Sequence, residues 1–250
     1  MADRPVCLVT GGAKRIGRAI LTALAGEFDL AIHANRSSAQ AQALAEELAH
    51  AGARTAVFAA DFRAPEAAVS MVEQAAAHFG RLDLVVNSAS AFEYDTPSNF
   101  DAKKMQEMLC VNLVAQTAVA QAFGRVGSQQ ATLINMLDNK VFAPNPDYFS
   151  YSLAKFGLNA ATDMLAMHYA GRMRVCGIAP SNTLVSGGQT ADEFARGWAA
   201  TLTGAGPTVD DIASAVRFIW ATKSINAETI VLDGGQRLMS RQRDVAFDKE

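Results

Sequence analysis

The chain has 250 residues, half of them hydrophobic, and its 25 acidic and 22 basic side chains give a net charge of −3. This length suits a single α/β domain with a large core. The chain carries no basic excess of the kind that binds nucleic acid or an anionic membrane. It shows neither a signal peptide nor an apolar stretch of membrane-spanning length. We therefore expect one cytoplasmic domain over residues 1–250, with a small-molecule substrate and no nucleic-acid or membrane partner.

Metal binding is not expected. The three cysteines are scattered and form neither a disulfide framework nor a zinc motif. The four histidines, His33, His50, His78 and His168, are dispersed without the spacing of metal ligands. Single histidines of this kind are more often surface or core residues, and the thiols suit a reducing compartment.

Short apolar runs alternate with longer helical patterns along the chain. The expected strands are Val6–Thr10, Leu30–His33, Thr55–Ala59, Leu82–Asn87, Thr132–Asn135, Val175–Ile178 and Thr229–Leu232. The expected helices are Arg15–Glu27, Ala39–Ala51, Pro65–Phe79, Phe100–Ala122, Tyr151–Tyr169 and Val209–Thr222. Runs that are apolar at consecutive positions are typical of strands covered on both faces. The alternation predicts a Rossmann-like, doubly wound parallel sheet with helices on both faces.

Polar residues and glycines mark several expected helix ends. Ser38 and Thr208 are expected as N-caps, and Gly52 and Gly80 as helix stops. Residues 181–207 break the alternation around a possible short helix at Ala191–Leu202, so we expect this segment to cover the substrate. The charged tail after Gly235 is either a frayed end or an arm that docks a partner.

A glycine-containing loop, Thr10–Gly17, joins the first strand to the first helix. Glycine allows the tight turn and the close approach of a pyrophosphate, and the helix N-terminus offers free N–H groups. The alternative is a plain turn that needed glycines. Its position in a β-α-β unit favours dinucleotide binding, with Gly11, Lys14, Arg15 and Ile16 in contact with the cofactor.

The end of the second strand indicates which dinucleotide binds. NAD sites commonly place an acidic residue there, but this chain has Asn35, Arg36 and Ser37. Arg36 can pair with a 2′-phosphate, which Ser37 can also contact. Arg36 could instead be a solvated surface cation. The missing acid together with the arginine favours NADP(H).

Tyr151 and Lys155 lie four residues apart in an expected helix, which places them on one face. An ammonium near a phenol lowers the phenol's pKa, and the tyrosine could then deliver a proton while hydride arrives from a nicotinamide. By itself the pair is common, and an interfacial tyrosine beside a solvated lysine would explain it equally well.

Motifs along nearly the whole chain resemble the short-chain dehydrogenase/reductase family. The matching pieces are Thr10–Gly17, Asp61, Asn87-Ser88-Ala89-Ser90, Asn112, the Tyr151/Lys155 pair, Pro180 and Asp233-Gly234-Gly235. The resemblance implies that Asp61 and Phe62 lie at the adenine, that residues 87–90 and Pro180 support the cofactor, and that Thr183 reaches the carboxamide. It further implies that Lys155 binds the nicotinamide ribose, that Asn112 helps hold a water chain to Lys155, and that the protein is a homotetramer.

Three departures from the common family pattern resemble its pteridine-reductase branch. Arg15 replaces a loop glycine, Asp138 stands where a serine usually polarises the carbonyl, and Phe92 follows the asparagine strand. In that branch the phenylalanine stacks on the pterin and the aspartate replaces the serine. The resemblance therefore implies a substrate site of Arg15, Ser90, Phe92, Asp138 and Tyr151. Two of these residues have a simpler explanation: Phe92 could fill the core, and Asp138 could cap a turn.

The sequence predicts an NADPH-dependent reductase of a dihydropterin or dihydrofolate-like substrate, with Tyr151, Lys155, Asp138 and Asn112 as its catalytic residues. A generic reductase of 3-oxoacyl, sugar or other carbonyl substrates is the first alternative, although an ionised Asp138 polarises a carbonyl poorly. A non-catalytic NADP-binding regulator is the second, although the presence of Tyr151, Lys155 and Asn112 speaks against it.

Overall fold

Seven parallel strands form one sheet in the computed structural model, which describes residues 4–186, 189–239 and 241–247. The strands are β1 (Val6–Val9), β2 (Asp29–Ala34), β3 (Thr55–Ala59), β4 (Leu84–Asn87), β5 (Ala131–Met136), β6 (Met173–Pro180) and β7 (Thr229–Leu232). Their order is β3-β2-β1-β4-β5-β6-β7, and every neighbouring pair is parallel. The order reverses between β1 and β4, where doubly wound sheets bind their ligands. The predicted fold class is confirmed.

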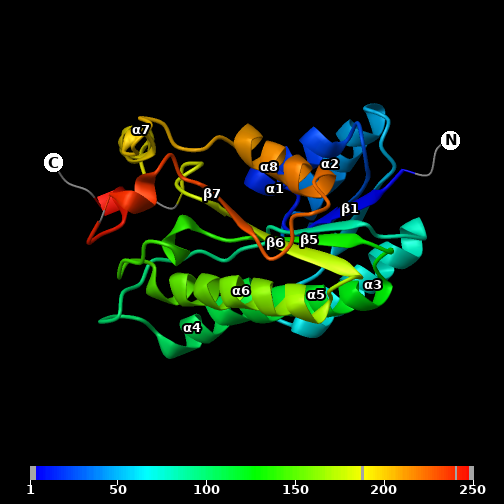
Figure 1. The fold of residues 1–250 in the computed structure, drawn as a ribbon, viewed down its shortest axis with the longest axis horizontal. Coiled ribbons are helices and arrows are strands. Elements are labelled where there is room, and N and C mark those ends of the chain that lie inside the picture. The colour runs from blue at the N-terminus through cyan, green and yellow to red at the C-terminus, as the bar shows by residue number, and fades with distance from the viewer. Residues whose placement is uncertain (1–3, 187–188, 240, 248–250) are drawn as a thin grey trace.

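Helices cover both faces of this sheet (Figure 1). One face carries α1 (Arg15–Leu24), α2 (Ser38–His50) and α8 (Val209–Ala221). The other carries α3 (Pro65–Phe79), α5 (Ala115–Val126) and α6 (Phe149–His168), and α4 (Ala102–Leu109) packs against α6. Every residue of β1, β2, β4 and β5 is buried, because both faces are packed. No helix within the described residues is both long and apolar enough to cross a membrane.

The helix expected over Phe100–Ala122 is wrong as a single element. A π-helical turn, Cys110–Val114, separates α4 from α5. A π-helical turn holds one residue more than an α-helical turn, which changes the direction of the side chains on it. Here the buried Asn112 side chain points to the backbone of Ala91. Such turns commonly occur at functional sites and have no strong sequence signature.

Smaller differences concern helix ends. Ser38 was expected as the cap of α2, but it is the first helical residue, and Ser37 occupies the cap position without a side-chain bond. The expected cap at Thr208 is confirmed by reciprocal hydrogen bonds with Asp211. Gly80 ends α3 at φ 79°. The helix in the 181–207 segment, α7 (Ala191–Ala199), is shorter than predicted.

Candidate active site

A cavity of about 570 Å³ lies at the carboxyl ends of β1, β4, β5 and β6. Thirteen of the residues predicted for the site line it: Gly11, Lys14, Arg15, Ile16, Ser88, Ala89, Ser90, Phe92, Asp138, Tyr151, Lys155, Pro180 and Thr183. The other seven, which do not line it, are Asn35, Arg36, Ser37, Asp61, Phe62, Asn87 and Asn112. The sheet thus brings together residues that are far apart in the sequence.

The loop after β1 is locked against the segment after β4. Gly11 has φ +65°, and a Cβ there would lie 2.9 Å from the Cα of Ala89, so glycine is required. The Thr10 hydroxyl accepts from the N–H groups of Ser88 and Ala89, each at 2.9 Å. No side chain caps the N-terminus of α1, which leaves its first-turn N–H groups for a ligand.

Arg15 has a positive φ of 53°, in the left-handed region that favours glycine. Its guanidinium donates to the carbonyls of Val185 at 2.8 Å and Leu184 at 3.4 Å. The side chain therefore fastens the phosphate loop to the segment after β6. This contact gives a reason for an arginine at a position whose backbone would be more relaxed with glycine.

The predicted adenosine contacts lie at the ends of β2 and β3, outside this cavity. Asn35 and Arg36 are exposed, and Ser37 is half-buried. The hydrogen bonds from Arg63 lower the pKa of the Asp61 carboxyl to about 2, so this carboxylate is ionised at neutral pH. Phe62 is buried.

Two predicted asparagines act through other residues. The buried Asn87 donates to the side chain of Asn135 at 2.9 Å and to the carbonyl of Gln116 at 3.2 Å, so it links β4, β5 and α5. The side-chain oxygen of Asn112 accepts from the hydroxyl of Ser90 at 2.8 Å. The same side-chain amide exchanges two hydrogen bonds with the backbone N–H and carbonyl of Ala91. A water chain from Asn112 to Lys155 stays a prediction.

Tyr151 lies beside Asp138, as the family resemblance implied. Its hydroxyl donates to the Asp138 carboxylate at 3.0 Å. The Lys155 ammonium donates to the Met136 carbonyl at 2.6 Å and lies 5.6 Å from the centre of the Tyr151 ring. α6 supplies Tyr151 and Lys155 one turn apart, and the segment after β5 supplies Asp138.

The predicted effect of Lys155 on Tyr151 is wrong for this arrangement. Burial raises the pKa of Tyr151 well above its usual value, and the neighbouring Asp138 raises it further. Burial also raises the pKa of Asp138 and lowers that of Lys155 to about 8. The Lys155 ammonium donates to the Met136 carbonyl and not to the phenol, so the raising effects of burial and of Asp138 on the Tyr151 pKa prevail.

Phe92 is 41% exposed and lines the cavity, so it does not fill the core. It stacks on Tyr148 with ring centres 4.3 Å apart and meets Tyr151 edge to face at 4.8 Å. Asp138 does cap a turn, through a bond from the Lys140 N–H, but its second oxygen accepts from Tyr151. Asp138 therefore caps a turn and contacts Tyr151 at the same time, and its role toward a substrate stays a prediction.

The C-terminal segment forms a wall of the cavity that the sequence did not predict. Asp244, Val245 and Ala246 line the cavity. Asp244 pairs with the buried Lys140 at 2.7 Å, and Arg243 pairs with the buried Asp147 at 2.8 Å. The tail thus docks on its own chain, and no periodic pattern in it could have indicated this.

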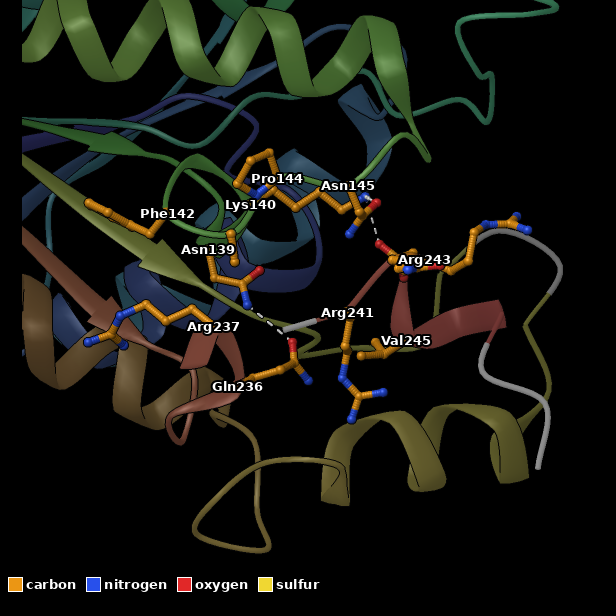
Figure 2. Close-up of a pocket in the computed structure, with 13 residues that line it drawn as sticks. Asn139, Lys140, Phe142, Pro144, Asn145, Gln236, Arg237, Arg241, Arg243 and Val245 are labelled. Carbon is orange, nitrogen blue, oxygen red and sulfur yellow. Dashed lines mark hydrogen bonds and ion pairs between the residues drawn. The ribbon is translucent and has the colours of Figure 1, made fainter. Parts of the chain in front are cut away.

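Behind this wall lies a second cavity of about 490 Å³, shown in Figure 2. Asn139 donates to Gln236 across it at 3.1 Å. Two of the arginines that line it are paired with carboxylates, Arg237 with Asp233 and Arg243 with Asp147, and Figure 2 shows these two guanidiniums pointing away from each other. Within the described part of the chain, no cluster of three or more His, Cys, Asp or Glu residues could hold a metal ion.

Comparison with known proteins places this site in a family. FolM alternative dihydrofolate reductase 1 from Brucella suis, solved in complex with NADP, superposes with a TM-score of 0.91 at 34% identity, covering 96% of this chain and 98% of that one. D-threitol dehydrogenase of Mycolicibacterium smegmatis is 30% identical, covering 93% of each protein. Pteridine reductase 1 of Leishmania tarentolae is 27% identical, covering 94% of this chain and 96% of the relative.

The family model described as short chain dehydrogenase matches residues 5–194. The matched range contains the phosphate loop, Asp138, Tyr151 and Lys155, which the structure brings to one cavity. The chain therefore belongs to the short-chain dehydrogenase/reductase family of oxidoreductases.

Proposed function

We propose that this protein is an NADPH-dependent reductase of a pteridine, a dihydropterin or dihydrofolate-like molecule. The observation that carries the proposal is the placement of Phe92 and Asp138 on either side of Tyr151 in one cavity. Phe92 is stacked on Tyr148 yet stays 41% exposed in the cavity, and an aromatic ring in such a place suits a flat heterocycle. A carboxylate can accept from the ring's amino group, which a simple ketone lacks.

NADP(H) fits the cofactor side of the site. The uncapped N-terminus of α1, with Gly11, Lys14, Arg15 and Ile16, would hold the pyrophosphate. At the adenosine end, contacts would come from Asn35, Arg36, Ser37, Asp61 and Phe62. The nicotinamide end would meet Ser88, Ala89, Ser90, Pro180 and Thr183, with Lys155 at the ribose, and the buried Asn87 would support this end from behind. The solved relative from Brucella suis binds NADP, which supports this choice over NAD.

The chain's own residues would handle the proton while the bound cofactor supplies hydride. The raised pKa of Tyr151 keeps its phenol protonated at neutral pH, as a donor in the reductive direction requires. Asp138, whose pKa burial also raises, would orient the ring, and after taking up a proton from solvent it could reprotonate the tyrosinate that proton donation leaves. Ser90 and Arg15 would line the ring site, and Asn112 would position Ser90.

The generic ketoreductase is the competing function, because D-threitol dehydrogenase is as similar overall as the pteridine relatives. The test follows NADPH oxidation with dihydrobiopterin, dihydrofolate, a 3-ketoacyl ester and a ketose in parallel, and repeats the active pairs with NADH. We expect turnover with a pteridine and a preference for NADPH. Turnover only with the ketoester or ketose would refute the pteridine substrate, and tight NADPH binding without turnover would favour a regulator.

The proposal also covers the segment over the site, the cellular location and the oligomeric state. Residues 181–207 would cover the substrate, and Leu184, Ser186 and Gln189 of that segment line the cavity. The protein would be a cytoplasmic homotetramer, as the family resemblance implies. Exposed apolar side chains on α6, among them Met164 and Met167, are compatible with subunit contacts.

A further inference from the structure

His33 is buried at the end of β2, where its side chain joins two segments of the cofactor side. Its Nδ1 accepts from the N–H of Gly11 at 3.1 Å, and its Nε2 lies 3.1 Å from the carbonyl oxygen of Ala60. Its backbone carbonyl also accepts from the N–H of Gly12 at 2.9 Å. One residue therefore holds both glycines that open the phosphate loop.

These partners determine the protonation state of the His33 ring. A carbonyl oxygen can only accept, so Nε2 must carry the hydrogen that faces Ala60. A backbone N–H can only donate, so Nδ1 must offer its lone pair to Gly11. Only the neutral Nε2–H tautomer satisfies both contacts. An imidazolium would turn a second N–H against the N–H of Gly11.

The surroundings of the His33 ring favour this neutral form. The ring stacks on the buried Phe62, with centres 4.4 Å apart and planes within 8°. Burial lowers the pKa of His33, and the hydrogen bond to the Ala60 carbonyl opposes that shift. The charged side chains on the elements around the ring are Lys14 and Arg15 of the loop, Asp61 and Arg63 after β3, and Arg36 after β2. Asp61 is already paired with Arg63, so the rest of this set is cationic.

We propose that His33 is a positioning residue of the cofactor site, which holds Gly11 and Gly12 in the phosphate-binding conformation only while its imidazole is neutral. Gly11 lines the cavity of about 570 Å³, whereas His33 does not, so His33 acts through the loop. The proposal rests on the proposed dinucleotide site but not on a pteridine substrate. It predicts that acid weakens cofactor binding through a residue that does not touch the cofactor.

The test is the affinity for NADP⁺, which is stable in acid, measured by calorimetry between about pH 5.5 and 8. The proteins compared are the wild type, His33→Asn, His33→Gln and His50→Asn. The His50→Asn variant is the control, because His50 is exposed at the end of α2. The 2′-phosphate of the ligand titrates near pH 6 in all four experiments. Differences between the proteins therefore report the histidine and not the ligand.

The amide oxygen of asparagine can take the place of Nδ1, whereas glutamine reaches toward Ala60 and leaves Gly11 unpaired. We expect His33→Asn to bind within about threefold of the wild type at pH 8 and to lose the additional weakening in acid. We expect His33→Gln to bind on the order of tenfold more weakly at every pH. Equal affinities of the two variants, or the same acid dependence in wild type and His33→Asn, would overturn the proposal.

Nitrogen NMR of the histidine-labelled wild type gives an answer that does not depend on the variants folding. We expect the Nε2–H tautomer for His33, and a pKa that falls further when NADP⁺ is bound. An Nδ1–H tautomer, or a pKa that rises on binding, would contradict the proposal. Failure of the wild type to bind NADP⁺ at any pH would refute the cofactor as well, whereas binding without sensitivity to His33 would refute only this role.

Discussion

The cofactor end and the substrate end of the active site are built by different means. At the cofactor end, the loop after β1 is held at its backbone groups: Gly12 donates to the carbonyl of His33, and Gly11 donates to the His33 ring and fits against Ala89. At the substrate end, side chains from separate segments hold the walls together, as in the Phe92–Tyr148 stack and the Lys140–Asp244 ion pair.

This difference suits a family whose members differ in name and substrate while sharing one fold. Backbone contacts survive many substitutions, whereas each side-chain contact at the substrate end can be replaced separately. Relatives as different in name as D-threitol dehydrogenase and pteridine reductase 1 align with more than nine-tenths of this chain. If the two ends are independent, changes at one end should leave the function of the other intact.

The largest effect is expected from Tyr151→Phe. The variant keeps the ring that meets Phe92 but removes the proton donor, so kcat should fall on the order of a thousandfold. The dissociation constant of NADPH, measured by fluorescence titration, should stay within about twofold. Full activity of the variant would mean that the proton comes from elsewhere, with Asp138 the next candidate.

Lys155→Met tests the residue at which the two ends meet. Burial lowers the pKa of Lys155 from its usual 10.5 to about 8. Below pH 8 the buried ammonium therefore destabilises the folded protein, and this penalty disappears as the pH rises toward 10.5. We expect the variant to lose activity but to gain about 2 kcal/mol in free energy of unfolding at pH 7. Urea unfolding of both proteins at pH 7 and pH 10 measures the gain. A gain of equal size at both values would show that the charge is not its cause.

Arg36→Ala tests the cofactor end alone. Loss of a charge-assisted bond to the 2′-phosphate should raise the KM for NADPH about tenfold and leave that for NADH nearly unchanged. The KM for the pteridine substrate should not move. Arg18→Ala, which removes an exposed cation paired with Glu47 on the next helix, is the matched control. An unchanged ratio of the two cofactor KM values would refute the role of Arg36.

The smallest effect is expected from loosening the C-terminal wall with Asp244→Asn. Because Asp244 lies on a terminal segment, the tail can move away when its pairing with Lys140 weakens, so global stability should change little. We expect the substrate KM to rise about tenfold or less, with NADPH affinity unchanged. Arg217→Gln, which breaks the exposed pair with Glu27, is the control. A large loss of stability would show that the tail is part of the fold, not a movable wall.

The fold could be predicted because it depends on local pattern, whereas the role of the Tyr151/Lys155 pair was inferred from the family resemblance. Buried strands have continuous apolar runs, and the four-residue spacing of Tyr151 and Lys155 fixes their common helix face. The tail could not be predicted, because Lys140 and Asp244 meet only through the tertiary fold. His33 could not be distinguished from an ordinary core histidine, since its partners are backbone groups on two other segments.

The direction of the Tyr151 pKa could not be predicted either. The sequence predicts that Lys155 is near the phenol, but it does not predict that the ammonium donates its hydrogen bond to the Met136 carbonyl. Electrostatic effects depend on orientation and burial, which spacing along a helix does not give.

The docked tail also has a practical consequence. Val245 and Ala246 line the cavity, so a tag fused at the C-terminal side follows a segment that forms one wall of that cavity. In Figure 1 the C-terminal turn lies beside α7, on the opposite side of the molecule from the start of β1. Affinity tags and fluorescent fusions therefore belong at the N-terminus. An assay of a C-terminally tagged protein would measure the tag's effect on substrate entry together with catalysis.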